Sequence, residues 1–403
     1  MRAWVVASWM ACGGPSEEPV DSGMAETPEP EEFAPELGTW DESLPVGIVV
    51  TRPSTTFFGP VTVWWQQRVP FDVRIEFRVE DGPWQASPAY QGVAGLNRQS
   101  IIGIPTGSTA DVRIVGAGDV AFEASGGSVT TPGLPASFPR ARVSANDASR
   151  WQPNGRYFLT SINQDSCSWC TGRYWTYIAD RSGTVYWATR SSDNRQVLFP
   201  QISVAGGDHV LWDEVVWTGQ ARDSVIHRTY LDQEIETVPA PGHHHAFLEL
   251  PDGTLVWGDR RSSEGEALVE LRPGTTEPQT VWTCRRDWLP EDSCRSNSLF
   301  FDPRSNRYWF SFYTQRAVVE IDRAWGRMNW SSIFDESPTG PRFYTFDPPE
   351  SQFDWQHGIV YLGDGRLLIS TDRSINDEGD VHTVVAEYEV DRTAGVFREV
   401  WSY

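Results

Sequence analysis

The chain has 403 residues, with 33 basic and 55 acidic side chains and a formal net charge of −22 at pH 7. Non-specific nucleic-acid binding and adsorption to anionic membranes both need patches of Lys and Arg, so this charge argues against both. The sequence holds 20 Trp, 12 Tyr, 19 Phe, 34 Gly and 28 Pro. Many aromatic residues between many turn residues favour an all-β protein of short strands.

Residues 1–14 combine one Arg, a short apolar run and a small residue before Cys12, and they predict a signal segment. Met-Ala-Cys-Gly around Cys12 resembles a bacterial lipobox, in which the cysteine is lipidated and becomes the new N-terminus. The apolar run is short for a signal peptide, so we expect the natural start further upstream. Residues 15–45 are rich in Pro and Glu and predict a disordered acidic tether. We therefore expect export to the periplasm, the outer membrane or the cell surface, with membrane contact only through a lipid anchor.

Residues 46–125 contain runs of strand length that alternate or are continuously apolar, separated by turn residues. Strands at this spacing predict a small β-sandwich. The order of its features resembles a fibronectin type III module, for which a spacer or packing role without chemistry is the simplest interpretation. Residues 126–142 are rich in Pro, Gly and Ser and predict a linker.

Residues 143–403 repeat one pattern: a polar residue, a short apolar strand, a tight turn and a second strand. The strongest copy is 243–259, with three histidines before the strand and an Asp-Gly turn within the hairpin. Further copies lie at 356–372, 297–312 and 175–190. Repeats of strands alone predict a β-propeller. Five blades are visible, so we expect six blades, with 144–151 closing the sixth against the C-terminus, or an incomplete set whose C-terminal end is truncated.

Five cysteines occur in the sequence, and apart from Cys12 they form two close-spaced pairs. Cys167 and Cys170 form a CxxC motif, but no second CxxC exists, and Cys284 and Cys294 are too far apart for a standard zinc knuckle. In an exported protein these four residues favour disulfides, either within each pair or between the pairs.

Nitrogen-bearing side chains stand near the start of the first strand in three blades: His245 (or His244), Arg295 and His357. In a propeller these strands line the central channel, so we expect the three side chains to meet at one channel mouth. Such a ring can bind an oxyanion, supply a nucleophilic imidazole or protonate a leaving oxygen. A metal site at 243–245 is a weaker alternative, because adjacent residues of an extended strand face opposite ways and no carboxylate lies within the run.

Three segments carry a resemblance to a known family: HHAFLELPDGTLVW (244–257), RSNSLFFDPRSNRYWFSFYTQRAVVEID (295–322) and FDWQHGIVYLGDGRLLI (353–369). With the preceding β-domain and the TPGLP linker, they resemble the bacterial arylsulfate sulfotransferases. The resemblance implies an exported six-bladed propeller behind an N-terminal β-domain. It also implies transfer of a sulfuryl group between phenolic compounds without a nucleotide sulfate donor, through a sulfurylated histidine, and it implies no cofactor and no metal.

The resemblance assigns roles to individual positions. His357 matches the nucleophile, and His245, or its neighbour His244, matches a sulfate-binding histidine. Arg295 stands where the family has a His two residues before the Asn-Ser pair that begins at Asn297, and it cannot act as a general acid. Tyr313 stands at a family Arg position, and Arg316 lies three residues further on and is a candidate replacement.

Two hypotheses follow. The first is an exported sulfotransferase-like enzyme that acts on small aromatic sulfates and phenols. Its activity is weakened or altered by the presence of Arg295 and Tyr313 at the family's His and Arg positions. The second is a non-catalytic cell-surface propeller that binds an anionic ligand or a protein partner. Neither the identity of donor and acceptor nor the oligomeric state follows from the sequence.

Overall fold

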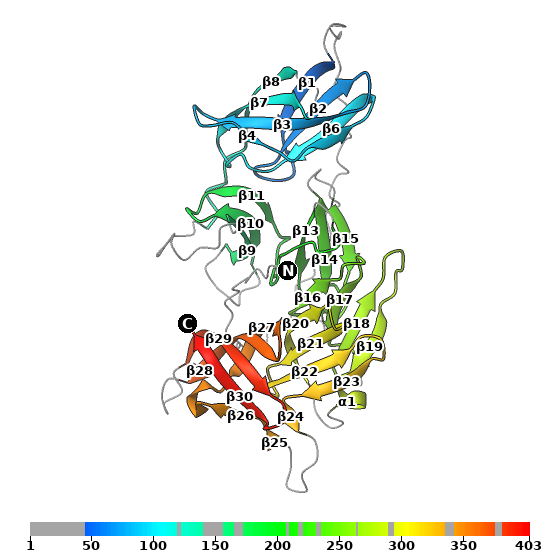
Figure 1. Ribbon diagram of the computed structural model, residues 1–403, viewed down its shortest axis with the longest axis vertical. Helices are drawn as coiled ribbons and strands as arrows, with labels where there is room; N and C mark the ends of the chain where they lie inside the picture. Colours follow the sequence, from blue (N-terminus) through cyan, green and yellow to red (C-terminus); the bar gives the residue numbers. More distant parts are fainter. Residues whose placement is uncertain are drawn as a thin grey trace. The chain divides into compact units, whose positions relative to one another are not determined.

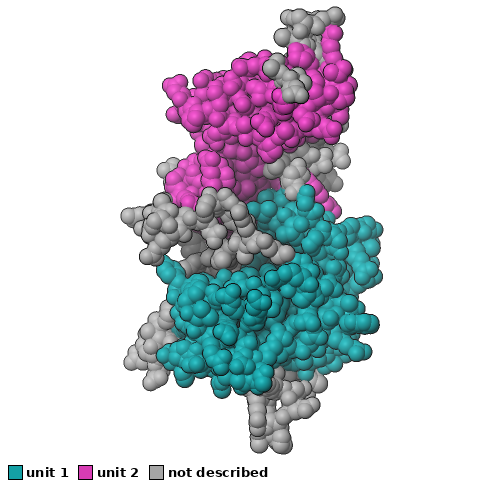
Figure 2. Space-filling view, viewed as in Figure 1, with its two compact units in different colours: residues 1–12, 194–228, 237–403 teal, residues 13–193, 229–236 magenta. Residues whose placement is uncertain are grey.

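The structure is a computed structural model and is almost entirely β (Figure 1). It describes residues 45–118, 122–139, 156–164, 172–206, 209–216, 221–230, 235–262, 265–288, 294–334, 342–374 and 381–403. Cys12, Cys167, Cys170 and nearly all of the predicted tether lie outside these ranges. No helix in the described ranges is long and apolar enough to cross a bilayer. The described chain divides into two compact units (Figure 2). Unit 1 contains residues 194–228 with 237–403, and unit 2 contains residues 45–193 with 229–236.

Unit 2 contains the predicted sandwich. One sheet has the order β1-β2-β6, and the other β4-β3-β7-β8 with β5 also paired to β3. The strands are β1 (Val46–Pro53), β2 (Val61–Gln67), β3 (Phe71–Val79), β4 (Gln85–Ala86), β5 (Tyr90–Gly92), β6 (Gly95–Ile101), β7 (Thr109–Gly116) and β8 (Glu123–Thr130). Alternate residues fill the core, as in Val61, Val63 and Trp65 of β2, because successive side chains of a strand point to opposite faces. β8 extends five residues into the predicted linker, since its backbone pairs with β7 as far as Thr130.

A three-stranded sheet of order β11-β10-β9 belongs to the same unit. Its strands are β9 (Tyr157–Asn163), β10 (Tyr174–Asp180) and β11 (Val185–Arg190). Phe58 and Phe138 pack on Trp175 of β10, with ring centroids 5.7 Å and 5.2 Å away. Gly59 is required here, because a Cβ at this position would lie 2.0 Å from the carbonyl oxygen of Tyr186.

The remaining strands form sheets that follow one another along the chain, with β12-β13-β14-β15, β16-β17-β18-β19 and β20-β21-β22-β23 as four-stranded meanders. Their pairings are antiparallel except for that of β26 with β30, which is parallel. The last sheet has the order β26-β30-β29-β28-β27, and β24 pairs with β25. Their bounds are β12 (Gln201–Ile202), β13 (His209–Glu214), β14 (Val225–Tyr230), β15 (Ile235–Pro239), β16 (Phe247–Glu249), β17 (Leu255–Asp259), β18 (Ala267–Leu271), β19 (Gln279–Thr283), β20 (Ser296–Asp302), β21 (Arg307–Phe312), β22 (Ala317–Asp322), β23 (Arg327–Ser331), β24 (Ile333–Phe334), β25 (Arg342–Phe343), β26 (Thr345–Asp347), β27 (Asp354–Gly363), β28 (Arg366–Ser374), β29 (Val381–Asp391) and β30 (Val396–Ser402).

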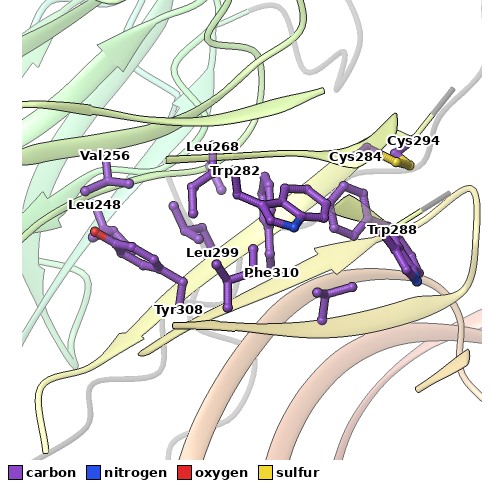
Figure 3. Packing of buried hydrophobic residues seen from close by; sticks show 14 of the residues in the cluster. Leu248, Val256, Leu268, Trp282, Cys284, Trp288, Cys294, Leu299, Tyr308 and Phe310 are labelled. Atoms are coloured by element: carbon purple, nitrogen blue, oxygen red, sulfur yellow. A yellow bond between two sulfur atoms is a disulfide. The ribbon is translucent and has the colours of Figure 1, made fainter. Parts of the chain in front are cut away.

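The β16–β19 and β20–β23 sheets contribute side chains to the core on both of their faces. In β21, Tyr308, Phe310 and Phe312 join the cluster shared with the β16–β19 sheet, whereas Trp309 joins the cluster shared with the β27–β30 sheet. Figure 3 shows the first cluster, with Trp282 between the two sheets. Sheets covered on both faces by neighbouring sheets are the blades of a β-propeller. The predicted fold class, a β-sandwich followed along the chain by propeller blades, is confirmed. The predicted closing segment 144–151 lies outside the described residues.

Candidate functional site

The candidate site is built where the first strands of three consecutive sheets meet. β20 contacts both β16 and β27. Ser298 Oγ accepts a hydrogen bond from the Ile359 backbone N–H at 2.8 Å, and Gln356 Nε2 donates to the carbonyl oxygen of Phe312 at 3.1 Å. These bonds hold the neighbouring sheets together at their inner edges. Short segments that are about 50 to 60 residues apart in the sequence are therefore brought together, as expected of propeller blades.

A cavity of about 230 Å³ lies beside these strands. Four of its lining residues, His244, His245, Arg295 and Tyr313, are among those predicted from the sequence. Cys294 was predicted only as a disulfide residue, and the remaining lining residues were missed by sequence reasoning; they are Arg260, Ser262, Gly265, Glu266 and Arg285. The cavity is therefore more basic than the sequence predicts, with three guanidinium groups against one carboxylate.

A disulfide between Cys284 and Cys294 brings two of the arginines to the cavity, and Figure 3 shows this bridge beside Trp288. The two cysteines are ten residues apart, and an arginine directly follows each of them: Arg285 and Arg295. This repeated Cys-Arg pair is the signal that could have predicted Arg285. Arg285 is the second residue of the short helix α1 (Cys284–Asp287), and Arg295 directly precedes β20.

Arg260 and Arg295 form no ion pair within the described residues. The adjacent Arg261, in contrast, binds Asp259 at 2.7 Å. A guanidinium stays charged at all accessible pH values, and its fork of N–H groups fits a planar pair of oxyanion oxygens. The cavity thus presents two guanidinium groups, those of Arg260 and Arg295, with which no described carboxylate forms an ion pair.

The three consecutive histidines have different partners. His243 Nε2 lies 2.9 Å from Asp213 Oδ2, and both side chains are fully buried. His244 Nε2 lies 3.1 Å from Glu266 Oε1, with its N–H directed off the line to that oxygen, and His244 Nδ1 lies 2.5 Å from His245 Nδ1. The predicted metal alternative has no support in the described residues, where no group of three metal-binding side chains converges.

Burial, and then the electrostatic effect of the neighbouring His244, lower the pKa of His245 well below its usual value, and the effect of His357 acts in the same direction. Burial likewise lowers the pKa of His357, against an opposing effect of Asp372. Burial alone would raise the pKa of Glu266, but the electrostatic effect of the nearby His244 and hydrogen bonds from Ser296 outweigh it and hold that pKa below its usual value. Both imidazoles are therefore neutral at pH 7, and the carboxylate is ionised.

His357 lies within β27 rather than before it, and it is not among the residues lining the cavity. The strand begins earlier than the sequence predicts because its register with β28 shifts between Asp354 and Gly358, and Trp355 there has a φ of +47°. Asn297 Nδ2 lies 2.9 Å from His357 Nδ1. His357 Nε2 and Asn297 Oδ1 are buried and have no hydrogen-bond partner in the described structure.

The two candidates at the end of β21 differ in position. Tyr313 lines the cavity, and its ring centroid lies 6.4 Å from that of His245. Arg316 is not a lining residue, because its Nε binds Asp354 Oδ1 at 2.9 Å. The replacement cation expected from Arg316 is therefore absent from the described cavity lining, and Arg260 and Arg285 provide positive charge instead.

We predict that stability decreases as the pH falls below about 6.5. In the unfolded chain His245 and His357 take up protons near pH 6.5, whereas their lowered pKa values keep them neutral in the folded chain. The unfolded state then binds more protons, so the unfolding free energy falls with pH, by up to about 1.4 kcal/mol for each unit of pKa lowering. Glu266, whose pKa is also lowered, adds a further loss below about pH 4.5.

Calorimetric melting temperatures between about pH 8 and pH 5 test this prediction. His245→Gln removes one of the titrating imidazoles, so its melting temperature is expected to depend less on pH than that of the wild type. His227→Gln, a change at a histidine stacked on Trp212 outside the cavity lining, is the matched control. Parallel wild-type and His245→Gln curves over the whole range would contradict the assignment.

No protein-family profile matches the chain, and no curated protein does. Among solved structures, the chain is similar to a luciferin-regenerating enzyme, at 7% identity over 83% of this chain and 93% of that one, with a TM-score of 0.38. It is also similar to the Cps50 (Swd1) β-propeller domain of Myceliophteria thermophila (9% identity, 63% and 71% coverage, TM-score 0.37) and to AztD from Citrobacter koseri (12%, 88% and 86%, TM-score 0.30). Likenesses at these scores carry no argument about the site, so the function rests on the site itself.

Proposed function

We propose that the chain is an exported sulfotransferase-like propeller that moves a sulfuryl group between phenolic compounds through a sulfurylated His357. The observation that carries the proposal is the cavity that Arg260, Arg285 and Arg295 line together with His245. Three guanidinium groups favour a small oxyanion that is the anion of a strong acid, such as a sulfate ester. The cavity volume lies below the range of about 300–1,000 Å³ that suits drug-sized ligands, so a compact ligand is favoured.

The proposed reaction has two steps. His357 Nε2 attacks the sulfur of an aryl sulfate held by the arginines, so that an N–S bond forms and the bond from sulfur to the phenolic oxygen breaks. An acceptor phenol then attacks the sulfur, and its oxygen takes the sulfuryl group from the histidine. A neutral imidazole is required for the first attack, and the lowered pKa of His357 supports this state at pH 7.

Arg295 changes one role relative to the resembling family. A histidine at this position can bind sulfate and donate a proton, whereas an arginine can only bind. Proton donation must then come from another group. The proposal also includes lipidation at Cys12, which rests on the lipobox-like sequence. The Cys284–Cys294 disulfide supports export, because such bridges persist in oxidising compartments.

One contact favours the non-catalytic alternative, in which the cavity binds an anion without turnover. An amide nitrogen can only donate, so Asn297 Nδ2 beside His357 Nδ1 favours the tautomer that carries its proton on Nε2. That tautomer has no lone pair on Nε2 for attack. Rotating the amide by half a turn would present Oδ1, which lacks a partner, and would favour the nucleophilic tautomer.

We predict that the purified chain releases nitrophenol from p-nitrophenyl sulfate when phenol is supplied, and that His357→Ala abolishes this release. The loss is expected because the covalent intermediate cannot form without the imidazole. Absorbance of nitrophenolate measures turnover, and mass spectrometry of a rapidly quenched sample detects the sulfurylated peptide.

His227→Ala is the control, since His227 is a histidine of unit 1 outside the cavity lining. Calorimetric titration with sulfate is carried out on all three proteins. Sulfate binding by the wild type without any nitrophenol release would establish the binding alternative and reject the transferase.

A further inference from the structure

We propose that Glu266, His244 and His245 form a proton relay, in which His245 is the catalytic base that deprotonates the acceptor phenol and the other two are positioning residues. This inference rests on the proposed sulfuryl transfer, for which it supplies the proton acceptor that Arg295 cannot be. It is carried by the order of contacts: carboxylate to His244 at 3.1 Å, and His244 to His245 at 2.5 Å between their Nδ1 atoms.

The carboxylate sets the first tautomer. Glu266 Oε2 accepts a hydrogen bond from the Ser296 backbone N–H at 2.8 Å, and Ser296 Oγ also contacts Oε1. Glu266 is therefore an acceptor toward its surroundings. A lone pair on His244 Nε2 facing this carboxylate would be repelled, so the His244 proton is held on Nε2.

The first tautomer determines the second. With its proton on Nε2, a neutral His244 has only a lone pair on Nδ1. The short contact between the two Nδ1 atoms then requires His245 to donate its own Nδ1–H to His244. The basic lone pair of His245 is consequently on Nε2, the ring nitrogen not engaged with His244, and His245 lines the cavity.

Burial makes this arrangement effective. Glu266, His244 and His245 are only 3%, 4% and 8% exposed, so water does not screen the carboxylate from the rings. The other pair, His243 with Asp213, lacks this connection: neither residue lines the cavity, and Asp213 instead accepts the Leu198 backbone N–H at 2.8 Å. We assign that pair to holding the segment before β16.

The protons balance over one turnover. The acceptor phenol gives its proton to His245 Nε2 as its oxygen attacks the sulfur and the N–S bond to His357 breaks. The His245 Nδ1 proton passes to His244 Nδ1, and the resulting imidazolium is stabilised by the Glu266 carboxylate. In the donor step the relay is neutral and gives no proton, so the donor leaves as a phenolate. The proton that the relay takes up in the acceptor step then passes through the solvent to that phenolate, which restores the neutral relay.

Glu266→Gln tests the relay. The glutamine side chain can donate a hydrogen bond to His244 Nε2, which would reverse both tautomers and place a proton on His245 Nε2. We expect transfer to weakly acidic phenols to fall about 100-fold, the lower end of general-base effects. Transfer to a strongly acidic nitrophenol, which is already ionised, is expected to change less than about threefold. The first burst of nitrophenol from p-nitrophenyl sulfate is expected to stay unchanged, because its leaving group needs no proton.

Ser296→Ala is the matched control, since it removes one hydroxyl contact of Glu266 and keeps the carboxylate. It is expected to keep the wild-type dependence on acceptor acidity. ¹⁵N NMR of the histidine rings adds a readout that does not need activity: His245 is expected to carry its proton on Nδ1 in the wild type and on Nε2 in Glu266→Gln.

The outcomes separate the two proposals. A wild type without a nitrophenol burst rejects sulfuryl transfer, and the NMR measurement then still decides the tautomers. A wild-type burst, with equal losses for weakly and strongly acidic acceptors in Glu266→Gln, overturns the relay and leaves sulfuryl transfer in place. A wild-type His245 that carries its proton on Nε2 overturns the relay regardless of activity.

Discussion

Arg295→Ala is expected to lower the rate of nitrophenol release about 100-fold to 1,000-fold, the range seen when one donor to a developing oxyanion is removed. Arg295 lines the cavity and stands directly before β20, beside the disulfide-bonded Cys294. In the proposed reaction, its loss removes a fixed positive charge beside the sulfate oxygens. Steady-state kinetics with p-nitrophenyl sulfate, together with calorimetric titration of sulfate, measure the effect on turnover and on binding.

Two further variants make this prediction specific. Arg295→Lys keeps the charge but loses the fork of N–H donors, so it is expected to recover only part of the activity. Arg286→Ala is the matched control, because Arg286 lies beside Arg285 on α1, binds Asp287 at 2.7 Å and does not line the cavity. If Arg286→Ala and Arg295→Ala weakened sulfate binding equally, the effect would be one of net charge and the assigned cavity would be wrong.

Trp282→Ala is expected to reduce the free energy of unfolding by about 3–5 kcal/mol, the range for deleting a large aromatic side chain from a packed core. Trp282 is fully buried, and its ring centroid lies 5.8 Å from that of Phe312 and 6.5 Å from that of Trp288. It fills the space between the β16–β19 and β20–β23 sheets (Figure 3). Because the residues that line the cavity stand in segments next to the strands of both sheets, we also expect weaker sulfate binding.

Urea denaturation followed by circular dichroism measures this loss. Trp325→Ala is the matched control, since Trp325 is 77% exposed and its removal opens no core cavity. We expect less than about 0.5 kcal/mol for this control, as for most surface substitutions. Equal losses in the two variants would show that Trp282 is not packed between the sheets.

The strands were predictable because the period of two is local information. Val61, Val63 and Trp65 alternate along the chain and all face the core of the sandwich. The blade strands carry apolar residues on both faces, as in β21, and such runs also predict strands when turn residues bound them. The end of the sandwich was less predictable. Gly126 and Gly127 indicate a loop by composition, but Gly127 pairs with Val112 of β7, and both glycines lie within β8.

The sequence by itself determined the all-β class, the order of the blades and four of the residues that line the cavity. Repeated strand and turn patterns place the residues near the start of each blade's first strand at the same end of successive blades. Only the tertiary structure decided that Arg260, Arg285 and Glu266 belong to the same cavity and that Arg316 binds Asp354 instead. None of those residues stands near the start of a blade's first strand, which is the position that repeats in the sequence. Their placement depends on a disulfide, a register shift and contacts between separate sheets, and none of these long-range contacts is encoded in local periodicity.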